Sequence, residues 1–313
     1  MVVVSMTTER CPTIAMGGDA MPFSRIVFGM WRLADWRLSR AERRALIEAA
    51  LELGVTSFDH ADIYGDYTAE ALFGEVLADA PPLRERIRLV TKCGIQLVSG
   101  RRPAYRFKRY DTRAAHIVAS VEQSLRALHT DRIDLLLLHR PDPLMDADEV
   151  AATFARLRRE GKVMGFGISN FSPSQAALLQ DRMATHGMSL ATNQVECSPL
   201  HLAPLDDGTF DQAQQWRCPP MLWSPLAGGR VLTDSTRAAI RVRECAARVG
   251  REFGVSAATA VFAWLLALPC RPLPIVGSSR IAALREAVAA THLALEHDAW
   301  FELLRAARGD DVP

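Results

Sequence analysis

Short apolar runs alternate with longer amphipathic segments along most of the chain, and this alternation predicts strands and helices in turn. Two helix starts are marked by capping residues. Ser39 precedes Glu42 by three positions, as in a capping box, and Ser172 precedes Pro173, which suits a first helical position. The expected strands lie at 26–29, 55–58, 87–91, 133–138, 162–168, 190–193, 220–223 and 273–276, with helices near 39–53, 68–78, 112–128, 147–160, 235–253, 256–268, 280–290 and 298–307.

Each of these eight strands is followed by a helix, which is typical of an α/β fold of the (β/α)8 TIM-barrel type. No linker-like Pro/Gly/Ser stretch divides the chain, so we expect a single domain over residues 1–313. Residues 1–25 are expected to be irregular apart from a small hairpin around 17–19, and residues 298–313 to form a last helix and tail. A doubly wound parallel sheet is the alternative, but no GxGxxG follows the first strand.

The composition excludes several function classes. The chain has 313 residues, 49% hydrophobic and 23% charged, with a net charge of +1, so no overall field attracts nucleic acid or an anionic membrane. The six cysteines are scattered without a CxxC pair, which indicates a reducing, cytoplasmic location and offers no metal site. The N-terminus lacks the pattern of a signal peptide, and no apolar run approaches the length of a membrane span.

Polar residues stand at or just after three successive predicted strands. Asp59 and Tyr64 follow the second strand, Lys92 the third and His139 the fourth. Because strand ends converge on one mouth of a barrel, these four side chains are expected to meet there. A Lys92 ammonium held by Asp59 would lower the pKa of Tyr64 and make it a general acid near neutral pH. Taken singly, Tyr64 also fits a packing role and His139 a core histidine.

Six motifs, in order and with sensible spacing, resemble those of the aldo-keto reductases, in particular a bacterial NADPH-dependent oxidoreductase branch. The similarity extends over roughly residues 25–290. The motifs are FDHADIYG at 58–65, TK at 91–92, LLH at 137–139, GISNF at 167–171, NQVE at 193–196 and WSPL at 223–226.

The resemblance implies hydride transfer from the nicotinamide C4 of NADPH to an aldehyde or ketone. It also implies that Tyr64 is the general acid, that Lys92 and Asp59 tune it, and that His139 orients the carbonyl oxygen. NADH is the less favoured cofactor, although Gly277, where many relatives carry a lysine, and Ala287, which replaces a frequent asparagine, weaken the expected preference. The residues that the resemblance assigns to the cofactor are Gly29, Met30, Ser169, Asn170, Gln194, Trp223, Ser224, Leu226, Gly228, Gly277, Ser278, Arg280 and Glu286.

The substrate pocket and the partners are less defined by the sequence. Trp31 and Tyr105 are expected to line the pocket, and the basic, aromatic 94–110 loop either grips an anionic substrate or forms a solvated rim. The expected partner is a small carbonyl compound, and a monomer is the expected state. The rival interpretation is a cofactor-binding regulatory or sensor subunit with little turnover.

Overall fold

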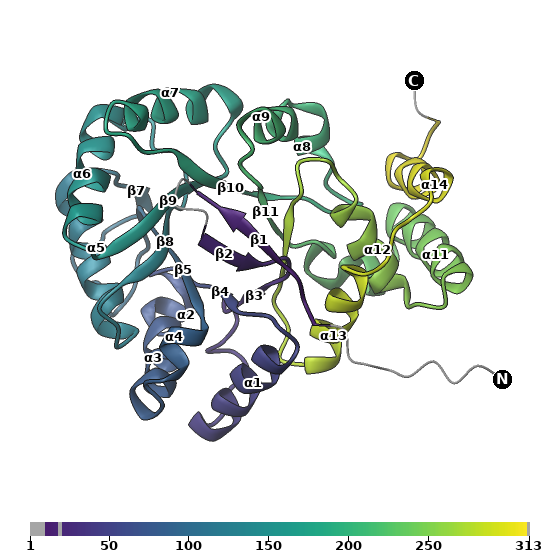
Figure 1. Ribbon diagram of the computed structural model, residues 1–313, viewed down its shortest axis with the longest axis horizontal. Helices are drawn as coiled ribbons and strands as arrows, with labels where there is room; N and C mark the ends of the chain where they lie inside the picture. Colours follow the sequence, from purple (N-terminus) through teal and green to yellow (C-terminus); the bar gives the residue numbers. More distant parts are fainter. Residues whose placement is uncertain (1–9, 18–20, 312–313) are drawn as a thin grey trace.

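Eight parallel strands close into a barrel in the computed structural model, which describes residues 10–17 and 21–311. Around the ring the order is β3, β4, β5, β8, β9, β10, β11 and β12, and β12 pairs with β3 to complete it (Figure 1). The predicted (β/α)8 barrel is therefore confirmed. The strands are β3 Val27–Gly29, β4 Ser57–Asp59, β5 Arg88–Cys93, β8 Ile133–Leu138, β9 Val163–Ser169, β10 Leu190–Glu196, β11 Met221–Trp223 and β12 Leu273–Val276.

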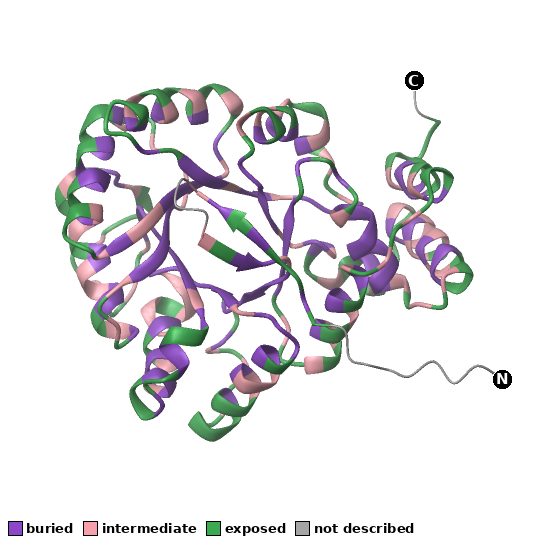
Figure 2. Cartoon of the chain, viewed as in Figure 1, coloured by how far each residue is buried: buried purple, intermediate pink, exposed green. Residues whose placement is uncertain are grey.

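Helices surround the barrel, with their exposed faces turned outward and their buried faces against the strands (Figure 2). The capping boxes at Ser39 and Ser172 both form, and Pro173 takes the first helical position. In the described part of the chain, no single helix is both long and apolar enough to cross a membrane. The longer helices are α1 Arg40–Glu52, α3 Ala69–Asp79, α5 Ala114–Ala127, α6 Ala147–Arg159, α7 Pro173–Ala184, α11 Arg237–Glu252, α12 Ala257–Leu266, α13 Ile281–Ala290 and α14 His297–Arg308.

Several short elements were not predicted, because a helix of one turn or a strand of two residues leaves no periodic pattern. Two short helices, α8 (Ala203–Asp206) and α9 (Thr209–Trp216), lie between β10 and β11. The 94–110 loop contains a small antiparallel pair, β6 (Ile95–Gln96) with β7 (Arg109–Tyr110). The others are α2 Tyr64–Tyr67, α4 Leu83–Arg86, α10 Arg230–Thr233 and the 3-10 helix η1 Ala227–Gly229.

A hairpin of β1 (Thr13–Met16) and β2 (Met21–Ser24) lies across one end of the barrel (Figure 1). It matches the hairpin expected in the N-terminal segment, although residues 18–20 of its turn and residues 1–9 lie outside the described residues. Ile14, Met16 and Phe23 pack into a core cluster with inward-facing strand residues. The barrel interior is thus filled with side chains and is plugged at this end. The strand members of that cluster are Val27, Val90, Leu135, Leu137, Ala191, Met221, Leu273 and Ile275.

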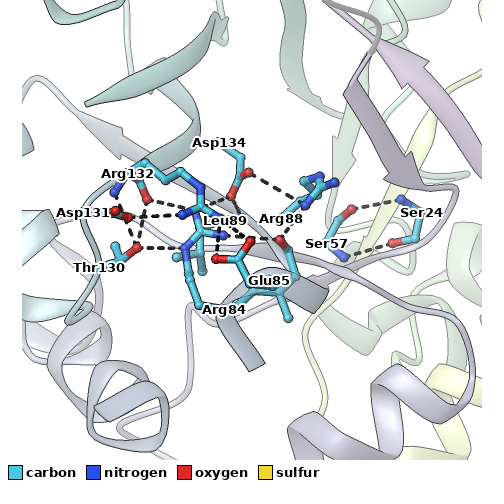
Figure 3. A network of polar contacts seen from close by, with 11 residues as sticks. Ser24, Ser57, Arg84, Glu85, Arg88, Leu89, Thr130, Asp131, Arg132 and Asp134 are labelled. Atoms are coloured by element: carbon cyan, nitrogen blue, oxygen red, sulfur yellow. Dashed lines mark hydrogen bonds and ion pairs between the residues drawn. The ribbon is translucent and has the colours of Figure 1, made fainter. Parts of the chain in front are cut away.

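A polar network ties the strands together near the starts of β5 and β8 (Figure 3). The Arg84 guanidinium donates to Asp134 Oδ2 at 2.8 Å, and the same oxygen accepts the Leu89 amide at 2.8 Å. Arg84 also donates to Thr130 Oγ1 at 2.8 Å and to the Arg132 carbonyl at 2.9 Å. Both charged side chains are buried, so each compensates the desolvation of the other.

Helix α3 approaches α5 closely at Gly74. A Cβ atom on this residue would lie 2.0 Å from the Ala127 carbonyl oxygen and 2.8 Å from Leu128 Cα, both backbone atoms. Gly74→Ala should therefore push the two helices apart and lower stability by about 1–3 kcal/mol, against the usual helical gain of up to about 1 kcal/mol for alanine. A lower thermal midpoint than that of Gly100→Ala is the expected readout, since Gly100 has no atom within 4 Å of the added methyl. An unchanged thermal midpoint in Gly74→Ala would mean that α3 and α5 can move apart without a loss of stability.

Candidate active site

The Lys92 ammonium lies at the centre of a compact polar cluster. Its Nζ donates to Asp59 Oδ1 and Oδ2 at 2.7 and 2.8 Å, to the His60 carbonyl at 2.8 Å and to Tyr64 Oη at 3.0 Å. Only 1% of Lys92 is exposed, so a buried cation here requires these acceptors. The structure therefore brings together three of the four residues expected to form the proton-handling site.

Strand geometry explains why Lys92 and Asp59 meet. Side chains alternate along a strand, so Lys92 shares the inward face of β5 with Val90, which belongs to the barrel-interior cluster. Asp59 ends the adjacent strand β4 and pairs in register with Val90. Both residues therefore lie within their strands and not after them, because β4 ends one residue and β5 two residues beyond the end that the apolar pattern predicted.

Tyr64 and His139 complete the cluster. The two rings contact edge to face with centroids 5.8 Å apart, and the His139 amide donates to the Cys93 carbonyl at 2.9 Å as the chain leaves β8. Directly after Tyr64 the chain takes three left-handed residues, Gly65, Asp66 and Tyr67, with φ of 58°, 53° and 64°. Such strained backbone is typical of functional sites and here fixes where the Tyr64 ring emerges.

The charge state of the cluster follows from burial. Burial raises the pKa of Tyr64, and the neighbouring Lys92 charge opposes this rise without cancelling it. The expectation that Lys92 lowers the pKa of Tyr64 below its ordinary value is therefore wrong, because desolvation outweighs the cation. Burial also lowers the pKa of Lys92, but Asp59 and Tyr64 outweigh it and the net direction is upward. Burial and the charges of Lys92, Arg140 and Lys108 hold the pKa of His139 well below its ordinary value, so the imidazole is neutral.

Gln194, which the resemblance assigns to the cofactor, contacts the cluster itself. Its side-chain Nε2 donates to Asp59 Oδ1 at 2.8 Å. Its backbone carbonyl accepts the Ser169 hydroxyl at 2.8 Å. Asn170 donates to Ser169 Oγ at 2.8 Å and accepts the Trp223 indole N–H at 3.1 Å. The ends of β9, β10 and β11 are thus joined to the Lys92 cluster by one continuous hydrogen-bond network.

The loops after β11 and β12 contain glycines at which a side chain would have open space. Added Cβ atoms at Gly229 would meet nothing within 4 Å, and one at Gly277 would meet only the Gly29 carbonyl at 3.9 Å. Ser224 and the run Ala227–Gly229 take left-handed φ, which turns the loop after β11 sharply. Ser278 accepts the Arg280 amide at 3.2 Å, and the Arg280 side chain is exposed. Unobstructed backbone at Gly229 and Gly277, with the Arg280 guanidinium nearby in sequence, fits an extended, phosphate-bearing nucleotide.

Other predicted site residues have different surroundings. Met30 is buried and its amide donates to the Asp59 carbonyl at 2.9 Å, which fixes the first loop on β4. Leu226 packs partly buried between two core clusters, and the carbonyl of Glu286 accepts the Thr259 hydroxyl at 3.2 Å. Ala287, the departure noted in the sequence, is fully buried in the core.

The two predicted pocket residues lie on loops. Trp31 is 58% exposed, with the Arg32 guanidinium 5.1 Å from its ring centroid. Tyr105 is half-buried in the 94–110 loop. Two contacts with Tyr67, three residues after Tyr64, hold that loop close to the cluster. The Leu97 amide donates to Tyr67 Oη at 2.8 Å, and the Arg102 guanidinium lies 4.9 Å from the Tyr67 ring centroid.

Sequence reasoning missed three buried polar residues next to the cluster: His60, Asp62 and Glu70. His60 packs edge-on against Phe73, and burial together with the Lys92 charge lowers its pKa to about 3. The available signal was the position of Glu70 in an apolar helical stretch, where a single acid on the buried face needs a reason.

Comparisons with a family model, with curated relatives and with a solved structure all find proteins of one family. The model of the Aldo/keto reductase family matches residues 25–307. The oxidoreductase YdhF of Escherichia coli is 51% identical over 302 residues, covering 96% of this chain and 98% of YdhF. A 6-dehydroglucose reductase of Agrobacterium fabrum is 44% identical over 298 residues, covering 94% and 97%. The crystal structure of the thermostable aldo-keto reductase Tm1743 with the inhibitor epalrestat has a TM-score of 0.77 at 24% identity, covering 94% and 99%, and shows the same fold.

Proposed function

The chain belongs to the aldo/keto reductase family and is an oxidoreductase acting on carbonyls, and we propose that it uses NADPH to reduce a small aldehyde or ketone with Tyr64 as the general acid. One observation carries this proposal. The Lys92 ammonium bonds both Asp59 and the Tyr64 hydroxyl beside a neutral His139, which is an arrangement that donates a proton to a developing alkoxide.

The roles of the protein side chains follow from their charges. Because the pKa of Tyr64 is raised, its hydroxyl is protonated at neutral pH and can give up its proton to the carbonyl oxygen. Lys92 then stabilises the phenolate that remains, and Asp59 with Gln194 holds Lys92 in place. The neutral His139 offers a second hydrogen bond to the same oxygen, where negative charge accumulates. When bound, the nicotinamide supplies the hydride.

Residues at the ends of β9 to β12 and in the loops that follow provide the cofactor site in this proposal. Ser169, Asn170 and Trp223 would hold the nicotinamide end, and the loop from Ser224 to Gly229 would lie against the phosphates. Arg280 with Ser278 would bind the 2′-phosphate, which is the basis for preferring NADPH over NADH. Gly29, Gly277 and Glu286 would border the path between these ends.

The substrate class is taken from the relatives. One relative at 44% identity is named a 6-dehydroglucose reductase, so polyhydroxylated aldehydes are the first compounds to test. The rival role, a regulatory or sensor subunit, is not favoured, since these relatives are named as oxidoreductases or reductases. We also propose that the protein is a monomer. A reducing, cytoplasmic location is proposed as well, and the six free thiols in the described residues support it.

Titration of the protein's tryptophan fluorescence with NADPH, and separately with NADH, tests the cofactor proposal. We expect NADPH to quench the fluorescence and to bind more tightly than NADH. Arg280→Ala should weaken NADPH by about tenfold or more and NADH hardly at all, because it removes one charge-assisted contact to the 2′-phosphate, worth about 1.5–3 kcal/mol. Arg285→Ala, an exposed arginine one turn further along α13, is the matched control.

Two results would contradict the proposal. Equal losses for both nucleotides in Arg280→Ala would move the 2′-phosphate site elsewhere. No binding of either nucleotide, checked by calorimetry, would remove the nicotinamide-dependent reaction altogether.

A further inference from the structure

Two cationic side chains near His139 have no partner, and the proposed reaction gives neither of them a role. Arg140 directly follows His139 and is half-buried, and Lys108 is exposed in the 94–110 loop. Neither side chain makes a hydrogen bond or an ion pair with another described residue. A half-buried guanidinium without an acceptor is unfavourable, so an acceptor that comes from outside the chain would stabilise it.

Backbone contacts bring the segment of Lys108 to the end of β8, where Arg140 lies. The His139 amide donates to the Cys93 carbonyl at 2.9 Å, and β6 begins two residues after Cys93. Lys108 immediately precedes β7, which is the antiparallel partner of β6. Burial lowers the pKa of His139 most, and the charges of Arg140 and Lys108 lower it further, so both cations lie within electrostatic range of the imidazole.

The acids nearest to these two cations in the sequence are engaged by other groups. Asp142 accepts the Thr112 amide at 3.1 Å and the Thr112 hydroxyl at 3.2 Å. Asp111 accepts two hydrogen bonds from the Arg113 guanidinium, at 2.6 and 2.9 Å. Neither carboxylate therefore neutralises the cations beside His139.

Other arginines of the 94–110 loop hold the loop itself. Arg109 donates to Gln96 Oε1 at 2.7 Å, across the β6–β7 pair, and Arg102 covers the Tyr67 ring. Arg106 is exposed and is not among the charges that act on His139. Lys108 is thus the cation of this loop that serves the mouth of the active site.

We propose that Lys108 and Arg140 form an anion subsite, which binds a carboxylate or phosphate group carried by the carbonyl substrate. This inference rests on the proposed reductase function and narrows its substrates to anionic aldehydes or ketones. The Arg140 guanidinium can bind two oxygens of such a group in a fixed geometry, and Lys108 adds a second positive charge from the loop. The carbonyl oxygen at the other end of the substrate would then face Tyr64 and His139.

Matched substrates test the subsite. 4-Oxobutanoate and butanal differ by a carboxylate, and glyceraldehyde 3-phosphate and glyceraldehyde differ by a phosphate. In wild type, kcat/KM for the anionic member should exceed that for the neutral member by about tenfold or more in at least one pair, which is the usual effect of a charge-assisted contact. The pair with the larger preference identifies the anion. Equal values within both pairs would overturn the proposal and leave the loop as a solvated rim.

Variants locate the source of this preference. Arg140→Gln should lower the ratio of anionic to neutral kcat/KM about tenfold, and Lys108→Met about threefold, because solvent screens the more exposed charge. Lys108→Arg should retain most of the ratio, since it keeps the charge. The ratio cancels any effect that a variant has on both substrates alike. Arg106→Ala, which removes one charge from the same loop, should keep the wild-type ratio, and a loss equal to that of Lys108→Met would overturn the subsite.

A second measurement does not depend on catalysis. The chain has three lysines, Lys92, Lys108 and Lys162, so labelling lysine Cε with carbon-13 gives three NMR signals. Succinate or inorganic phosphate should shift the Lys108 signal, which Lys108→Arg identifies, and butane-1,4-diol should not. Lys162, paired with Glu122 and Glu160, is the internal control.

The NMR result separates this proposal from the proposed function. No shift of the Lys108 signal with either anion, or an equal shift of Lys162, would overturn the subsite even if neutral carbonyls are reduced. A selective Lys108 shift without reduction of any carbonyl would support the subsite and contradict the proposed function.

Discussion

Tyr64→Phe is expected to lower kcat for carbonyl reduction by about 10²–10⁴-fold, the usual contribution of a positioned general acid. Phenylalanine keeps the ring and its edge-to-face contact with His139 but removes the hydroxyl that lies 3.0 Å from Lys92 Nζ. The affinity for NADPH should change little, because none of the proposed cofactor contacts involves the Tyr64 hydroxyl. Single-turnover rates together with fluorescence titrations separate the two quantities.

The control for this variant is Tyr110→Phe, which removes a phenol from β7 and should leave kcat near the wild-type value. Loss of NADPH binding in Tyr64→Phe would show that the hydroxyl serves the cofactor site. Unchanged turnover in Tyr64→Phe would exclude Tyr64 as the acid and leave the charged Lys92, whose pKa is raised, as the nearest alternative donor.

Asp134→Ala should produce the largest loss of stability, about 3–5 kcal/mol, because it leaves the Arg84 guanidinium buried without its carboxylate. Both side chains are less than a tenth exposed, and Asp134 also accepts the Leu89 amide at the start of β5. Urea unfolding followed by circular dichroism measures this change. Activity at urea concentrations below the unfolding transition should persist, since the network lies at the starts of β5 and β8, whereas Lys92 lies near the end of β5 and His139 directly after β8.

Two comparisons sharpen the stability experiment. Glu48→Ala breaks the exposed Arg44–Glu48 pair on α1 and should cost no more than about 1 kcal/mol. Replacing both members of the buried pair, as in Arg84→Met with Asp134→Leu, should recover much of the loss, because no buried charge is left unpaired. A double variant as unstable as Asp134→Ala would assign the loss to the Leu89 and Thr130 contacts.

The sequence predicted the elements that repeat a pattern over many residues. All eight strands were placed within a few residues, and Ser39 and Ser172 were correctly identified as caps, since capping is a local interaction between neighbours. The meeting of Asp59, Tyr64, Lys92 and His139 was also predicted, because barrel strands carry their final residues to one mouth.

What the sequence could not supply depends on three-dimensional neighbours. The contact of Gln194 with Asp59 joins residues 135 positions apart, and no local pattern specifies it. The raised pKa of Tyr64 depends on how far burial outweighs the Lys92 charge. A sequence motif does not specify how deeply its residues are buried. For Glu70 the apolar helical stretch around it was the available signal, but the sequence alone does not show that it is buried, since an acid in the first turn of a helix usually faces solvent.

Closure of the barrel by β3 and β12 has a consequence for synthesis on the ribosome. Val27 and Phe28 pair with Ile275 and Val276, so the first barrel strand finds its last neighbour only when nearly the whole chain has emerged. Until then one edge of β3 presents unpaired backbone groups, which is the kind of surface that recruits other nascent chains. Release of an active enzyme should therefore depend on protection of that edge during translation, and truncated chains ending before residue 273 should accumulate as aggregates.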